Sequence, residues 1–68
     1  MDPTPATTRV RYTRVRNIDS DRLRRRLAYL QANRADIARA CDSRNELSHF
    51  ARELIVVELE LVRRFLGQ

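Results

Sequence analysis

The chain has 68 residues, with 14 basic residues against nine acidic ones, and carries a net charge of +5. A chain this short forms one small domain and buries only about 60% of the surface that its unfolded form exposes. Cys41 and His49 are each the only residue of their type, so they exclude an internal disulfide and make a poor metal site. Oligomerisation is the remaining way to complete so small a core.

Residues 1–18 are predicted to form a flexible or extended arginine-rich arm. Residues 9–13 (Arg-Val-Arg-Tyr-Thr) are echoed by residues 14–18 (Arg-Val-Arg-Asn-Ile). Their β-branched and aromatic side chains allow a short strand. Strict alternation is broken, however, because Val10 and Tyr12 share a face that Val15 does not.

A first helix is predicted over about residues 20–41. Asp19 offers an N-cap, and Asp21 places a negative charge in the first turn, where the helix dipole favours it. Spacings of three and four residues put the apolar positions on one side of this helix. They are Leu23, Leu27, Leu30, Ile37 and Cys41. Arg34 stands where an apolar residue belongs, and we expect it either to contact Glu53 of the next helix or to extend its charged end into solvent.

A second helix is predicted over about residues 43–66. Ser43 and Glu46 have the spacing of a capping box, and Gly67 can end the helix. Its inner apolar stripe consists of Leu47, Phe50, Leu54, Val57, Leu61 and Phe65. Two helices of matched length suit antiparallel packing. The fold class is therefore all-α, an antiparallel helical hairpin over residues 19–68 preceded by an extended basic arm.

An alternative fold depends on Asn33 and Arg34. A basic strand followed by two helices resembles the ribbon-helix-helix regulators, whose first helix is much shorter. That likeness requires a break near Asn33. If the chain breaks there, a three-helix domain replaces the hairpin.

The second helix carries a further apolar stripe that a hairpin cannot cover. Its members are Ala51, Ile55, Leu59, Val62 and Leu66. Exposed together, they would form a surface large enough to cause association. We expect them to be the interface of a homodimer, in which two hairpins form a four-helix bundle. The alternative is that the arm folds back and covers them.

Catalytic chemistry finds little support in the sequence. Ser48 and His49 are adjacent, so on a helix they point about 100° apart and do not form a nucleophile–base pair. Gly67 is the only glycine, which excludes a glycine-rich phosphate loop. The longest aliphatic run, residues 54–57, is far shorter than the roughly 20 residues of a membrane span. We expect a non-enzymatic, cytoplasmic protein without cofactor, metal or membrane partner.

The sequence therefore favours a small regulator or inhibitor that binds and occludes a larger protein. In size and composition it is similar to the compact proteins that phages and mobile elements use against host factors. The residues predicted to contact the partner lie in the arm and the first helix: Arg9, Arg11, Tyr12, Arg14, Arg16, Arg22, Arg25, Arg26 and Tyr29. The alternative is a dimeric regulator that binds DNA or RNA, with the arginines of the arm following phosphates.

Overall fold

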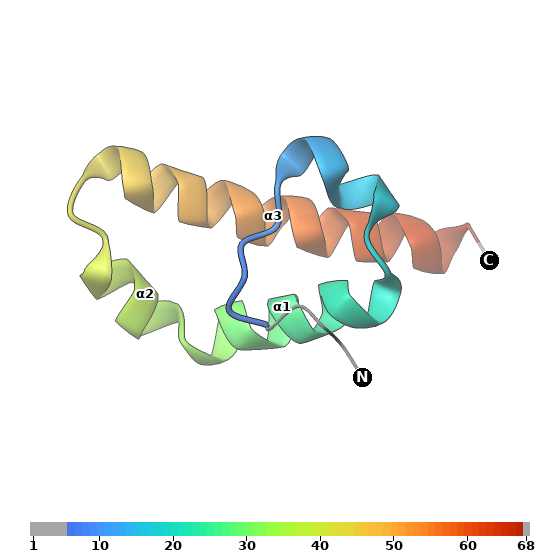
Figure 1. The fold of residues 1–68 in the computed structure, drawn as a ribbon, viewed down its shortest axis with the longest axis horizontal. Coiled ribbons are helices and arrows are strands. Elements are labelled where there is room, and N and C mark those ends of the chain that lie inside the picture. The colour runs from blue at the N-terminus through green and yellow to red at the C-terminus, as the bar shows by residue number, and fades with distance from the viewer. Residues whose placement is uncertain (1–5, 68) are drawn as a thin grey trace.

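The computed structural model describes residues 6–67, and its only regular secondary structure in that range is helical. The elements are the short 3-10 helix η1 (Tyr12–Asn17), α1 (Ser20–Ala32), α2 (Arg34–Ala40) and α3 (Arg44–Leu66). α1 and α2 follow one another, α3 returns beside them in the opposite direction, and η1 lies across α3 from α1 (Figure 1). The predicted all-α class is confirmed.

The first predicted helix is interrupted at Asn33. The backbone N–H and side-chain Nδ2 of Asn33 both donate to the carbonyl oxygen of Tyr29, at 3.0 and 2.9 Å. A side chain that bonds to a carbonyl four residues earlier competes with the hydrogen bonds that would continue the helix. The prediction of one continuous helix over residues 20–41 is therefore wrong, and the chain has the three-helix alternative.

The ends of α3 follow the predicted signals. The Ser43 hydroxyl accepts a hydrogen bond from the Glu46 N–H at 3.2 Å. The Glu46 carboxylate bonds to the N–H of Asp42 at 2.9 Å, one residue earlier than a standard capping box requires. α3 ends just before Gly67, as predicted, but Gly67 keeps a right-handed helical conformation, and its N–H donates to the Arg63 carbonyl as any helical residue would. Local side-chain chemistry thus determines where this long helix begins.

η1 forms where the sequence predicted an extended arm. The Arg14 N–H donates to the Arg11 carbonyl at 3.1 Å, and the Ile18 N–H donates to the Val15 carbonyl at 3.3 Å. Because a 3-10 helix has about three residues per turn, Tyr12, Val15 and Ile18 share one edge. Val15 is buried and the other two are half-buried, so this edge faces the helices. The period of three explains why the alternation expected of a strand is broken here.

The hydrophobic core is small and includes side chains from the N-terminal segment. Its buried members are Val10, Val15, Leu23, Leu30 and Val57. Val10 is only 1% exposed. The prediction of a free arm over residues 1–18 is therefore wrong for residues 6–18, while residues 1–5 lie outside the described residues. The physical reason is that two packed helices leave an open side, and Val10 and Val15 cover part of it.

A buried ion pair between Arg26 of α1 and Glu53 of α3 joins the helices to the N-terminal segment. The guanidinium donates through Nε to Oε2 at 2.7 Å and through Nη2 to Oε1 at 2.9 Å. Oε2 also accepts from the Val10 N–H at 2.8 Å, and Arg26 Nη1 donates to the Ala6 carbonyl at 2.9 Å. The predicted contact between Arg34 and Glu53 is wrong. Arg34 is exposed, because the helix breaks just before it.

We predict that Glu53→Gln destabilises the fold by about 3–5 kcal/mol, because it leaves the buried Arg26 charge without a counter-ion. This is a large part of the roughly 3–10 kcal/mol expected for a domain of this length. Urea unfolding followed by circular dichroism at fixed protein concentration measures the loss.

Two further variants make this result interpretable. Asp42→Asn is the matched control, because this exposed side chain has no partner within residues 6–67, and we expect a change below about 0.5 kcal/mol. Replacing both partners, as Arg26→Met with Glu53→Leu, is expected to cost less than Glu53→Gln alone, since no buried charge remains. A loss below about 1 kcal/mol for Glu53→Gln would contradict a structural role for the pair.

Candidate functional site

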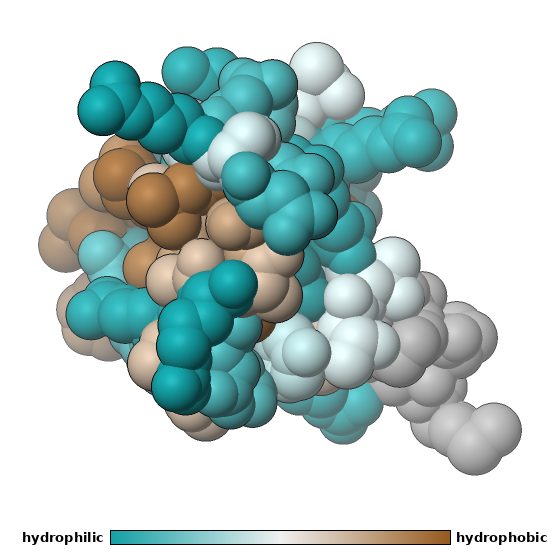
Figure 2. Space-filling view, turned by 90° about the vertical axis from the view of Figure 1, so that its left-hand side faces the viewer, coloured by the Kyte–Doolittle hydropathy of each residue, from teal (hydrophilic) through white to brown (hydrophobic). Residues whose placement is uncertain are grey.

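One side of α3 carries large hydrophobic side chains that no other part of residues 6–67 covers. We call it the α3 apolar face, and its members are Leu47, Ala51, Ile55, Leu59, Val62, Phe65 and Leu66. Leu59 is 61% exposed and Leu66 is 73% exposed. Viewed from the end where α2 meets α3, hydrophobic side chains gather on one side of the molecule (Figure 2). All five residues predicted as the dimer interface belong to this face and are exposed.

Two members of the α3 apolar face were assigned by the sequence to the inner stripe. Phe65 is 74% exposed and Leu47 is 43% exposed, so neither contributes to the core. They lie near the two ends of α3. The exposed surface is therefore broader than the sequence predicted.

The N-terminal segment folds back onto a different side of α3. The Tyr12 hydroxyl lies 3.3 Å from both Nδ1 and the carbonyl oxygen of His49. The Val10 N–H reaches Glu53. At about 100° per residue, His49 and Glu53 lie on the side of α3 roughly opposite Val62. The alternative in which the arm covers the second stripe therefore does not describe this chain.

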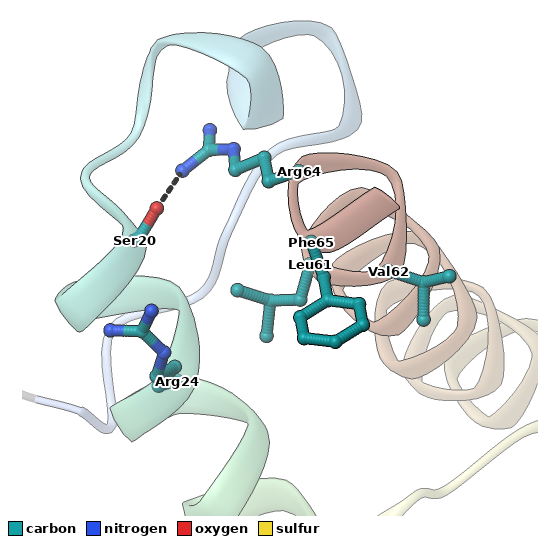
Figure 3. A pocket seen from close by; sticks show the side chains of 6 residues that line it. All are labelled: Ser20, Arg24, Leu61, Val62, Arg64 and Phe65. Atoms are coloured by element: carbon teal, nitrogen blue, oxygen red, sulfur yellow. Dashed lines mark hydrogen bonds between the residues drawn. The ribbon is translucent and has the colours of Figure 1, made fainter. Parts of the chain in front are cut away.

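A shallow pocket adjoins the α3 apolar face at the C-terminal end of α3. Leu61, Val62 and Phe65 line it from α3, and Ser20 and Arg24 line it from α1 (Figure 3). Its apolar wall is continuous with the α3 apolar face, since Val62 and Phe65 belong to both. A hydrophobic side chain of a partner could enter it beside the Arg24 guanidinium.

The N-terminal segment carries a second candidate surface, which we call the N-terminal arginine surface. It consists of Arg9, Arg11, Arg14 and Arg16, all of them exposed. Within residues 6–67, none of these four pairs with a carboxylate. Arg11 and Arg14 are one 3-10 turn apart and share an edge, with a rise of about 6 Å between them. The fold thus holds these charges on an ordered segment and leaves them unpaired.

The other residues predicted to contact a partner, which are Tyr12 and the predicted residues of α1, differ in how far they are exposed. Arg26 is buried against Glu53, so it is not available to a partner in this fold. Its guanidinium carbon lies 5.5 Å from the centre of the half-buried Tyr29 ring. Tyr12 is half-buried, with the Arg52 guanidinium 5.7 Å from its ring centre. Arg25 is exposed and Arg22 is half-buried, so of the three α1 arginines predicted to contact a partner these two reach the surface.

Glu60, which the sequence analysis missed, binds two arginines and holds η1 through one of them. Its Oε2 accepts from Arg63 Nη2 at 2.6 Å and from Arg64 Nε at 2.8 Å. Arg64 also donates to Ser20 Oγ at 2.9 Å and to the Val15 carbonyl at 3.1 Å (Figure 3 shows the bond to Ser20). The hydrogen bonds from Arg63 and Arg64 lower the pKa of Glu60 from 4.5 to about 2. The signal was present, because arginines three and four residues after a glutamate can pair with it on a helix.

We predict that Glu60→Gln reduces the acid dependence of stability. The folded pKa of Glu60 lies below 4.5, so its ionised form stabilises the fold above that pH, and this contribution is lost as the pH falls toward about 2. The urea concentration at the unfolding midpoint should therefore decrease for the wild type as the pH is lowered through this window. For Glu60→Gln the decrease should be smaller. Equal slopes for wild type and Glu60→Gln would contradict the assignment.

Among the described residues, no helix combines the length and the apolar character needed to cross a membrane. Nor do these residues place three or more histidine, cysteine, aspartate or glutamate side chains where they could hold a metal ion. No protein-family model, curated protein or solved structure matches the chain. Its two exposed surfaces, one apolar and one basic, are therefore the basis for a functional proposal.

Proposed function

We propose that the chain is a non-enzymatic regulator that works as a homodimer and binds and occludes a larger protein. The observation that carries this proposal is the α3 apolar face. Ile55, Leu59 and Phe65 are each more than half exposed on one helix. Burial of apolar surface is favourable by about 25 cal/mol per Å², and monomeric proteins rarely expose contiguous apolar surfaces of this kind.

A second copy of the chain is the occupant that we propose for the α3 apolar face. A twofold symmetric dimer uses the same surface on both copies, so one stripe is enough to build it. In such a dimer, α1 and α3 of the two copies together make a four-helix bundle. The shared interface also supplies the apolar burial that a domain of this length lacks by itself.

The larger protein is then bound by the basic surface that the dimer leaves free. The N-terminal arginine surface is the main part of this site, and α1 adds the half-buried Arg22 and Tyr29 side chains. Guanidinium groups bind carboxylates in a bidentate geometry, which suits an acidic protein surface. Such charges raise the association rate and select the partner, and occlusion follows from the size of the bound dimer.

A second candidate function is the binding of DNA or RNA, and one observation favours it. The arginines of the N-terminal arginine surface lack carboxylate partners within residues 6–67, and unpaired arginines also bind phosphate. The Tyr12 ring does not add to this surface, because its hydroxyl bonds to His49 and the ring lies beside Arg52. Base stacking on Tyr12 is therefore not part of this candidate.

We predict that Leu59→Arg converts the dimer to a monomer, because it places a charge at the centre of the shared apolar interface. Sedimentation velocity at several concentrations measures the mass, and circular dichroism checks that the helices remain. The matched control is Ala35→Arg, which adds the same side chain at an exposed position of α2 and should leave the dimer unchanged. An unchanged dimer mass for Leu59→Arg would show that another surface mediates association.

A second test separates a protein partner from a nucleic acid. Replacing Arg9, Arg11, Arg14 and Arg16 by alanine is expected to abolish capture of the partner from source-cell extract, with the helices and the dimer intact. Arg34→Ala with Arg44→Ala, two exposed arginines at the other end of the molecule, is the control and should retain capture.

The same capture repeated after nuclease treatment decides the partner class. We expect the captured protein to remain after this treatment. Loss on nuclease treatment, together with DNA or RNA binding whose log–log salt slope is roughly −4 to −7, would replace the protein partner by nucleic acid. Capture that does not depend on the four arginines would contradict both candidates.

A further inference from the structure

The centre of the α3 apolar face has the spacing of a coiled-coil seam. Ile55, Leu59, Val62 and Leu66 follow one another at intervals of four, three and four residues, the pattern of alternating a and d positions. We infer that α3 lies parallel to α3 of the second copy, with both helices running in the same direction. This inference rests on the proposed dimer. We call these four residues the α3 seam.

The residues beside the α3 seam carry opposite charges on its two sides. At about 100° per residue, Glu58 lies about 70° to one side of the seam and Arg63 about 70° to the other. Arg52 lies on the same side as Arg63. The seam therefore has one acidic border and one basic border.

Each border keeps a net charge within a single copy. Glu58 is exposed and has no ion-pair partner within residues 6–67. The Arg63 side chain is 58% exposed and binds Glu60, but Glu60 is shared with Arg64. One carboxylate thus faces two guanidinium groups, and Arg64 is directed toward η1 by its other hydrogen bonds. Arg63 binds both oxygens of Glu60, so the three side chains together keep one positive charge, and the exposed Arg63 presents this cluster beside the seam.

Only a parallel arrangement brings the acidic border of one copy against the basic border of the other. In a parallel pair, position 58, which precedes the seam residue Leu59, faces position 63 of the partner helix, five positions further along the sequence. Glu58 of each copy then faces Arg63 of the second copy, and twofold symmetry makes this contact twice. An antiparallel pair instead places borders of the same charge together. Arg52 and Arg63 of one copy then face Arg52 and Arg63 of the other.

The N-terminal segment limits how far the seam extends. Arg52 occupies the position one heptad before Leu59, where an apolar residue would continue the seam. Its guanidinium lies over the Tyr12 ring instead. The seam therefore begins at Ile55 and is about 16 Å long. Because it is short, the charged borders have a large influence on the orientation of the two helices.

Reversal of the charge at Glu58 tests the border contact. In the parallel dimer, Glu58→Arg places the new arginine against Arg63 of the second copy twice, and we expect the dimer Kd to rise about 5- to 30-fold. Glu58→Gln removes the attraction without adding repulsion and should have a smaller effect. Asp42→Arg, the same charge change in the loop before α3, is the control. An unchanged Kd for Glu58→Arg overturns the parallel arrangement.

Disulfide cross-linking of the Ile55→Cys variant in a Cys41→Ser background tests the orientation directly. A disulfide needs Cα atoms about 4.4–6.8 Å apart. In the parallel dimer the two cysteines face each other, and we expect a covalent dimer on mild oxidation. In an antiparallel dimer they are about 16 Å apart, and each faces position 66 of the other copy. The Ile55→Cys chain would then cross-link only to a Leu66→Cys chain.

The outcomes separate this inference from the dimer itself. Cross-linking of Ile55→Cys to itself, at a rate above that of the Ala35→Cys control, supports the parallel seam. Cross-linking only between Ile55→Cys and Leu66→Cys overturns the parallel seam and leaves the proposed dimer in place. A dimer mass without cross-linking in either combination has the same two consequences. A wild-type chain that is monomeric at every concentration overturns both.

Discussion

The ion pair between Arg26 and Glu53 is the interaction on which the arrangement of this chain depends. Glu53 accepts two hydrogen bonds from the guanidinium and one from the Val10 N–H, and Arg26 also binds the Ala6 carbonyl. A buried charge without a partner is costly. The N-terminal segment therefore packs where it completes this pair, on the side of α3 that carries Glu53.

That placement has consequences for both exposed surfaces. Val10 and Val15 complete the core on one side of α3, so the N-terminal segment that carries them does not cover the opposite side. Ile55 and Leu59 lie there and remain exposed in the described residues. Arg64 holds η1 from the other end through Ser20 and the Val15 carbonyl. The arginines between these two attachments are left at the surface. One packing arrangement thus leaves an apolar face open and presents a basic face elsewhere.

Local signals in the sequence predicted local structure well, and long-range pairings poorly. Ser43 marks the start of α3 because capping depends on a few neighbouring atoms. The exposed stripe of α3 also follows from helical periodicity. The predicted partner of Glu53 was the wrong arginine, however, because Arg34 and Arg26 both lie near the inner side of the first predicted helix. Choosing between them requires knowing that Asn33 breaks the helix. The three-residue period of η1 was present in the sequence, but it is hidden when the segment is interpreted with a period of two.

The central claim is that the single chain is incomplete and that a second copy covers the α3 apolar face. Sedimentation equilibrium of the wild-type chain over a range of micromolar concentrations tests this most directly. The account predicts a mass that approaches twice the 8.0 kDa of one chain as the concentration rises. A folded species that stays at 8.0 kDa across the whole range would contradict it.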